Sequence, residues 1–187
     1  YKPQRWFESR GGFPKDMKPR VWAAGDIPEG LEALGDKGEG GPLFPITTAR
    51  VGAGVCMAMR RDVLMEVGPF DPALGAGTAT RGGEDLDMFA RILATGDVII
   101  HTPDALVHHR HRVDEAGLDK QIRGNGSGMA ALLTKAIIEK PSVLCTLVGR
   151  IPGILKRIKP GGARVAGRDD DTPGSLTRSE IKGFLEG

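Results

Sequence analysis

Two glycines followed by a short acidic cluster constrain the fold of this chain more than any other stretch. In Thr80-Arg-Gly-Gly-Glu-Asp-Leu-Asp-Met-Phe-Ala-Arg91 the glycines precede carboxylates that stand where a helix begins. Leu86, Phe89 and Leu93 then fall on one face at helical spacing. We therefore expect an amphipathic helix that ends at Gly96. The glycines should keep its acidic first turn open to a ligand instead of packing it under side chains.

A segment rich in histidine and arginine follows this helix, Val107-His-His-Arg-His-Arg112. We expect two short strands at 97–101 and 105–109, and the second strand would deliver the histidines. In a regular strand His109 and His111 lie on one face. Carboxylates and imidazoles that meet from separate elements are the raw material of a general-base or metal site. The pattern therefore favours an enzyme over a plain binding module.

Both halves of this pattern also have a purely structural interpretation. The exposed amide groups of a helix start stabilise carboxylates by about 0.3–1 kcal/mol, so Glu84, Asp85 and Asp87 need no function to occur there. A strand end rich in histidine and arginine is also typical of a solvated basic surface. Anion or metal binding by the histidines is about as well supported as that alternative. Zinc is disfavoured because neither cysteine is close in sequence.

Length and composition are those of a folded protein with room for one substantial core. The 187 residues are 40% hydrophobic and 27% charged, and the net charge of +2 is too small to favour nucleic-acid binding. No apolar run approaches the roughly 18 residues of a membrane-spanning helix, and no secretory signal is visible. Cys56 and Cys145 lack disulfide or metal spacing, so we expect reduced thiols in the cytosol.

The segments before the acidic motif are predicted from their glycines and apolar runs. Residues 1–45 are rich in Gly and Pro and should form a short helix, loops and at most a hairpin, with 31–41 as a surface loop. Residues 50–60 read as a buried strand entered through Gly-x-Gly, where another backbone or a ligand approaches closely. Residues 61–67 should form a short helix that stops at Gly68.

Three further helices are expected in the C-terminal part. The pattern from 114 to 139 is helical, although Gly124, Gly126 and Gly128 weaken its middle. After a linker rich in Gly and Asp, Thr177-Arg-Ser-Glu180 has the form of a capping box and should start a small terminal helix.

The remaining helix lies between these two, runs from Ser142 towards Lys159, and is amphipathic and basic. Its apolar stripe comprises Leu144, Leu147, Val148, Ile151, Leu155 and Ile158. Six basic residues and no acidic one lie between Leu147 and Arg168. Packing against another helix explains such a stripe slightly better, while in-plane contact with an anionic membrane is the functional alternative.

Taken together, three motifs resemble those of bacterial family-two glycosyltransferases. They are Gly-Ala-Gly-Val-Cys-Met-Ala-Met-Arg-Arg-Asp-Val-Leu-Met-Glu-Val-Gly-Pro-Phe-Asp (52–71), Gly-Gly-Glu-Asp-Leu-Asp (82–87) and His-His-Arg-His-Arg (108–112). The resemblance covers roughly residues 1–135. It implies an α/β fold, a partial GT-A-like mixed sheet with flanking helices, followed by C-terminal amphipathic helices. The implied division is 1–140 for the acceptor-side half, 141–160 for the basic helix, and 161–187 for a linker and short terminal helix.

The resemblance also implies an activity and roles for residues. Such enzymes move a sugar, with inversion, from a nucleotide-diphosphate donor to the hydroxyl of a saccharide or lipid-linked acceptor, usually with Mn²⁺ or Mg²⁺ on the diphosphate. Cell-envelope polysaccharide synthesis, in the cytoplasm or on the inner face of the plasma membrane, is the implied setting. The matched residues are Asp85 as general base with Glu84 second, His109 at the metal, and Gly52, Gly54, Arg81, Gly83, Asp87 and His111 as substrate contacts.

The chain departs from the family pattern in two places. The earlier nucleotide-binding half and its Asp-x-Asp metal motif have no counterpart, because Asp85-Leu-Asp87 lies in the acceptor-side motif. Residues 121–126 fit the Gln-x-x-Arg-Trp motif of some relatives poorly. With no initiator methionine either, we expect the later, catalytically incomplete part of a longer polypeptide. A non-catalytic sugar-binding or membrane-docking domain and a metal-dependent phosphoester hydrolase remain the alternatives.

Overall fold

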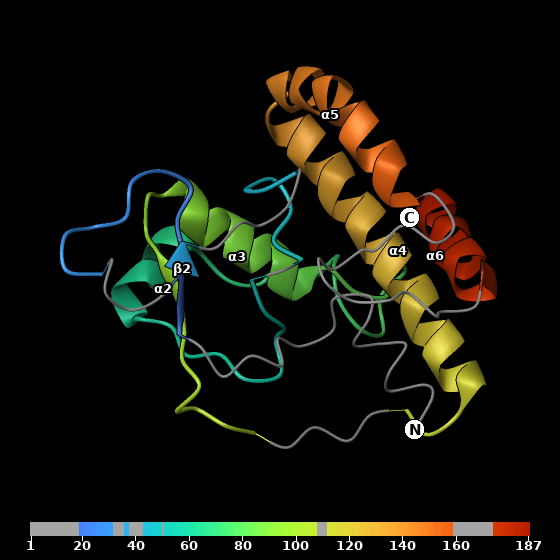
Figure 1. The fold of residues 1–187 in the computed structure, drawn as a ribbon, viewed down its shortest axis with the longest axis horizontal. Helices are drawn as coiled ribbons and strands as arrows, with labels where there is room; N and C mark the ends of the chain where they lie inside the picture. The colour runs from blue at the N-terminus through green and yellow to red at the C-terminus, as the bar shows by residue number, and fades with distance from the viewer. Residues whose placement is uncertain (1–18, 32–35, 38–42, 50, 108–111, 159–173) are drawn as a thin grey trace. The chain divides into compact units, whose positions relative to one another are not determined.

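A computed structural model describes residues 19–31, 36–37, 43–49, 51–107, 112–158 and 174–187 (Figure 1). The protein is mixed α/β and mostly helical. It divides into two compact units. The sheet unit comprises 14–71 and 84–109, and the helical unit comprises 1–13, 72–83 and 110–187. Within the described ranges, no helix is long and apolar enough to cross a membrane.

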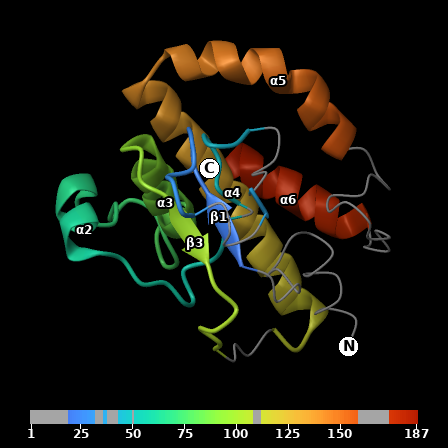
Figure 2. The same ribbon diagram turned by 60° about the vertical axis from the view of Figure 1, so that its left-hand side comes forward.

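The sheet unit is built on three short strands in the order β2-β1-β3. Strand β1 (Arg20–Trp22) pairs in parallel with β2 (Asp36–Lys37) and antiparallel with β3 (Ile99–His101), where Val21 faces Ile100. Strands β1 and β3 lie side by side in Figure 2. The hairpin that the sequence allows within residues 1–45 is not formed by β1 and β2, because these strands run in the same direction. The predicted loop at 31–41 also contains β2 in its described part.

Both helices predicted for the sheet unit are confirmed. Helix α2 (Arg61–Val67) ends at Gly68, whose φ of 79° suits glycine and whose N–H donates to Leu64 O at 3.0 Å. Helix α3 (Glu84–Ala94) carries its acidic residues in the first turn and is followed by Gly96, with a φ of 94°. The core of the sheet unit is Trp22, Val51, Phe89 and Leu93. The apolar face of α3 therefore covers the sheet as its spacing predicts.

Two predicted strands are not formed. Residues 51–60 contain no strand, and Gly54, Val55 and Cys56 are exposed. The N–H of Gly54 donates to a side chain instead of a neighbouring strand. Residues 105–107 are also irregular, and Leu106 is 66% exposed, so this segment has no core face that would hold it as a strand. The remainder of that predicted strand, His108–His109, lies outside the described residues.

In its described residues, the helical unit contains three helices after the irregular segment 72–83. Helix α4 (Glu115–Glu139) begins at Asp114, whose side chain accepts from Gly117 N at 2.6 Å, and α5 (Ser142–Ile158) follows directly. Helix α6 (Gly174–Glu186) starts three residues before Thr177, so the predicted capping box lies inside it and does not begin it. Leu118, Ile122 and Leu176 form the shared core of α4 and α6.

The glycines in the middle of α4 are explained by the closeness of its neighbours. A Cβ added at Gly126 would lie 2.9 Å from the backbone nitrogen of Phe184 in α6. A Cβ at Gly183 of α6 would lie 2.8 Å from the backbone carbonyl carbon of Arg123. Side chains at these positions would separate the two helices. Glycine therefore occurs here in spite of its low helix propensity, because it lets the two backbones touch.

Candidate acidic site at the start of helix α3

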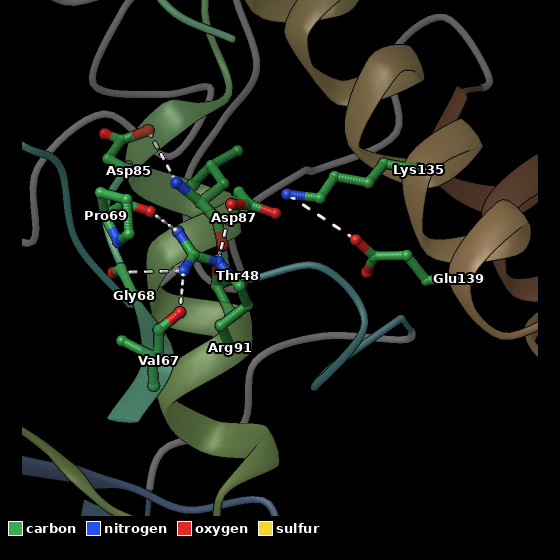
Figure 3. A network of polar contacts seen from close by, with 10 residues as sticks. Thr48, Val67, Gly68, Pro69, Asp85, Asp87, Arg91, Lys135 and Glu139 are labelled. Atoms are coloured by element: carbon green, nitrogen blue, oxygen red, sulfur yellow. Dashed lines mark hydrogen bonds and ion pairs between the residues drawn. The ribbon is translucent and has the colours of Figure 1, made fainter. Parts of the chain in front are cut away.

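The carboxylate of Asp85 connects the first two sequence motifs within the sheet unit. Asp85 is the second residue of α3, and its Oδ2 accepts a hydrogen bond from Gly54 N at 2.8 Å. Its Oδ1 accepts from Leu86 N at 2.8 Å. Figure 3 shows the side chain turned back along the start of the helix. The segment around Gly54 is thus tied to the acidic motif by a hydrogen bond between residues 31 apart in sequence.

A side chain at position 54 would crowd this contact, whereas a side chain at position 52 would not. A Cβ on Gly54 would lie 3.0 Å from Met57 Cε and 3.2 Å from Asp85 Cβ. A Cβ on Gly52 would meet only the Phe89 ring, at 3.9 Å, which is ordinary van der Waals contact. The close approach predicted for both glycines is therefore found at Gly54, where the approaching group is the Asp85 side chain. Sugar contacts at the two glycines stay predictions.

The Asp85 carboxylate is held in place but can still accept further hydrogen bonds. Each carboxylate oxygen has two lone pairs, so each can accept a second hydrogen bond beyond the one from its backbone donor. The residue is half-buried, as is Glu84, the first residue of α3. A carboxylate that is oriented by the backbone and still reachable is suited to accept a proton from a bound hydroxyl.

Asp87 has a different environment from the other two acids. It is 3% exposed, and its Oδ2 accepts from Arg91 Nε at 2.9 Å (Figure 3). The Arg91 guanidinium also donates to the carbonyl oxygens of Val67, Gly68 and Pro69, the last at 3.0 Å. This network ties the end of α2 to α3. It gives Asp87 a structural role, and the substrate contact predicted for Asp87 stays a prediction.

Thr48 also forms a hydrogen bond with the first turn of α3. It is fully buried, and its Oγ1 donates to Leu86 O at 2.8 Å. Nothing in the sequence around Thr48 signals this contact, because the two residues are 38 apart. The Asp87–Arg91 pair, by contrast, has the i, i+4 spacing that favours an ion pair on a helix, and this signal was available in the sequence.

Arg81 and Gly83 belong to the helical unit, where each has a structural partner. Arg81 has a left-handed φ of 61°, and its guanidinium forms an ion pair with Glu186 of α6 at 3.1 Å. Arg123 of α4 pairs with the same carboxylate, donating from Nε to Glu186 Oε2 at 2.8 Å. The hydrogen bond from Arg123 lowers the pKa of Glu186. The phosphate contact predicted for Arg81 stays a prediction, and it would compete with Glu186.

Gly83 allows the loop before α3 to touch α4. A Cβ added there would lie 2.8 Å from the backbone oxygen of Gly128, and the φ of Gly83 is 98°. Both observations require glycine for backbone reasons. Gly83 therefore serves packing, and a substrate contact at Gly83 stays a prediction.

The predicted histidine side of the site lies outside the described residues, which end at 107 and resume at 112. His109 as a metal ligand and His111 as a substrate contact therefore stay predictions. Within the described ranges, no three metal-ligating side chains come together. Cys56 and Cys145 are exposed free thiols, as their spacing predicts.

Comparison with protein-family models, with curated proteins and with solved structures found no match.

Proposed function

We propose that this chain supplies the acceptor side of an inverting glycosyltransferase with a GT-A-like fold, in which Asp85 is the general base. The observation that carries the proposal is the hydrogen bond from Gly54 N to Asp85 Oδ2. It joins the two motifs on which the resemblance to family-two glycosyltransferases mainly rests, and it presents a carboxylate beside an exposed glycine segment.

The proposed chemistry is proton removal from the acceptor during attack. A sugar hydroxyl is a weak nucleophile until a positioned carboxylate accepts its proton, an effect of about 10²–10⁴-fold in rate. Asp85 accepts that proton as the acceptor oxygen bonds to the anomeric carbon and the bond to the nucleotide diphosphate breaks. The backbone donors Gly54 N and Leu86 N fix the carboxylate in one orientation meanwhile. Glu84, beside it in the first turn of α3, is the second choice for the base.

The leaving diphosphate requires positive charge, for which the sequence offers Arg81, His109 and His111. Mn²⁺ or Mg²⁺ with His109 as a ligand remains part of the proposal, and manganese accepts a nitrogen ligand more readily than magnesium does. The steps assigned here to Asp85 and its backbone donors do not depend on that ion. The donor is a nucleotide sugar, and the acceptor is a saccharide or a lipid-linked saccharide.

Product analysis tests the class of reaction. The complete native polypeptide would be incubated with a panel of nucleotide sugars and divalent metal, with and without acceptor saccharides. We expect nucleoside diphosphate release that depends on the acceptor, together with a new glycoside. His109→Ala should reduce turnover. Release of phosphate from simple phosphoesters without any acceptor would instead identify a hydrolase.

A non-catalytic sugar-binding domain is the second candidate. It is favoured by the two backbone hydrogen bonds to Asp85, which also fit a carboxylate that only fastens the Gly54 segment to α3. In that case sugar binding, followed by calorimetry, would be unchanged in Asp85→Asn, and no nucleotide sugar would be turned over.

A further inference from the structure

Helix α5 exposes an apolar face instead of burying it. Leu144, Val148 and Ile151 are 51%, 57% and 45% exposed, and they recur at i, i+4 and i+7 on one side of the helix. Val143 and Leu147, on the neighbouring side, are half-buried. The helix therefore packs along one edge of its apolar stripe and leaves the other edge in contact with solvent.

This arrangement favours the lipid interpretation of the stripe over packing against another helix. Packing against another helix would bury the largest apolar side chains, but the described half of α5 keeps three of them substantially exposed. The cost of exposing three such residues on one continuous face points to a partner surface.

The charge of α5 identifies the kind of partner. Its 17 residues, SVLCTLVGRIPGILKRI, include three basic residues and no acidic one. The segment from 159 to 168 adds three more basic residues in sequence, again with no acidic one. An apolar face on a helix with only positive charge is complementary to a lipid interface with anionic head groups.

We propose that α5 lies in the plane of an anionic lipid surface, with Leu144, Val148 and Ile151 inserted among the acyl chains. A helix of this length and basic character lies in the interface instead of spanning it, consistent with the absence of any membrane-crossing helix in the described ranges. The proposal rests on the exposed face of α5 and on the basic residues of α5 and of 159–168, and it is independent of glycosyl transfer. This excess of positive charge favours a surface of anionic lipid head groups as the partner.

Vesicle sedimentation with the full chain tests the proposal. The protein would be mixed with phosphatidylcholine vesicles, and with equimolar phosphatidylcholine and phosphatidylglycerol vesicles. We expect binding to the anionic vesicles that weakens as salt is raised. Because a fully buried apolar side chain contributes enough for about tenfold in affinity, Val148→Gln/Ile151→Gln should weaken binding at least tenfold. Circular dichroism would confirm that the variant keeps its helix content.

The apolar control lies elsewhere on the surface. Leu185 in α6 is 80% exposed and Met65 in α2 is 75% exposed, so Leu185→Gln and Met65→Gln remove comparable apolar side chains outside α5. Both should leave vesicle binding unchanged. Equal loss of binding in these controls would overturn the assignment to α5.

The charge contribution has its own matched pair of variants. Lys156→Gln/Arg157→Gln removes two cations from α5, and we expect about fivefold weaker binding for each. Arg178→Gln/Lys182→Gln removes two exposed cations from α6 and should have little effect. Equal binding to neutral and anionic vesicles, or no binding to either, would overturn the proposal. Self-association without vesicles that is lost in Val148→Gln/Ile151→Gln would overturn it in favour of a second copy of the chain.

Discussion

Replacing two helical glycines with alanine should change the stability of the protein in opposite directions, because one glycine lies against a neighbouring backbone and the other faces open space. Gly183 lies in the interior of α6 against the backbone of Arg123, whereas Gly149 lies in α5 with nothing within 4 Å of its added Cβ. Replacing an exposed helical glycine with alanine stabilises a protein by about 0.5–1 kcal/mol, because alanine loses less backbone entropy on folding. Gly149→Ala should gain that amount.

Gly183→Ala should destabilise the protein. Its Cβ would lie 2.8 Å from the carbonyl carbon of Arg123, and a backbone atom cannot move aside by a change of rotamer. The helices must separate, which also loosens the contact of Leu176 with Leu118 and Ile122. Overpacking of this kind costs about 1–3 kcal/mol, and the gain in helix propensity offsets about 0.5–1 kcal/mol of it. We therefore expect a net loss of about 1–2 kcal/mol.

Thermal and urea unfolding, followed by circular dichroism, measure both changes. For a chain of this size, 1 kcal/mol corresponds to about 2–4 °C in Tm. Gly183→Ala should lower Tm by about 2–8 °C, and Gly149→Ala should raise it by about 1–4 °C. If Gly183→Ala is as stable as the wild type or more stable, the backbone contact between α4 and α6 is refuted.

Three further predictions follow from the described contacts. Arg91→Ala should lower the free energy of unfolding by about 2–3 kcal/mol in a urea titration, because it removes an ion-pair partner of the buried Asp87 carboxylate. Arg60→Ala, which breaks the exposed pair with Asp62, should have no measurable effect in the same titration. Arg123 lowers the pKa of Glu186 in the folded protein, so the stabilisation from this carboxylate is present above the pKa of an unfolded glutamate and is lost as pH falls through the lower folded pKa. The difference in Tm between the wild type and Glu186→Gln should therefore vanish in acid. A difference that persists in acid would refute the ion pair. Gly54→Ala should reduce transferase turnover about tenfold or more through displacement of Asp85, and Gly52→Ala should keep near wild-type turnover; equal effects would contradict the contact geometry.

The helices were predictable because their signals are local. The acidic first turn and Gly96 bound α3, Gly68 ends α2, and Asp114 caps α4, each as its residue type predicts. The strands were less predictable, because an apolar run such as 51–60 is compatible with a strand until its partner is known. Here the partner of Gly54 is a side chain on α3, and no neighbouring strand holds the run.

The sequence singled out the residues of the candidate site, and their roles stay predictions. Gly54 and Asp85 were both singled out from the sequence, but the hydrogen bond between them was not predicted, because the approach expected at Gly54 was that of another backbone or a ligand. The ion pair of Arg81 with a residue 105 positions later depends on tertiary packing that no local pattern contains, whereas the i, i+4 spacing of Asp87 and Arg91 was a local signal for their pair. The start of α6 was also missed: the helix already includes Gly174 and Leu176, which packs on Leu118 and Ile122 of α4, so the capping-box sequence at Thr177 lies inside the helix.

The measurement that tests the proposed chemistry most directly is the kcat of the complete native polypeptide with Asp85→Asn, compared with Asp97→Asn. Both variants remove one charge from a half-buried aspartate in the sheet unit. Asp97, however, lies beyond the far end of α3 and accepts a hydrogen bond from Thr95 Oγ1. We predict that Asp85→Asn lowers kcat by about 10²–10⁴-fold with unchanged acceptor binding, while Asp97→Asn keeps wild-type turnover. Wild-type kcat in a folded Asp85→Asn variant would contradict the assignment of the general base.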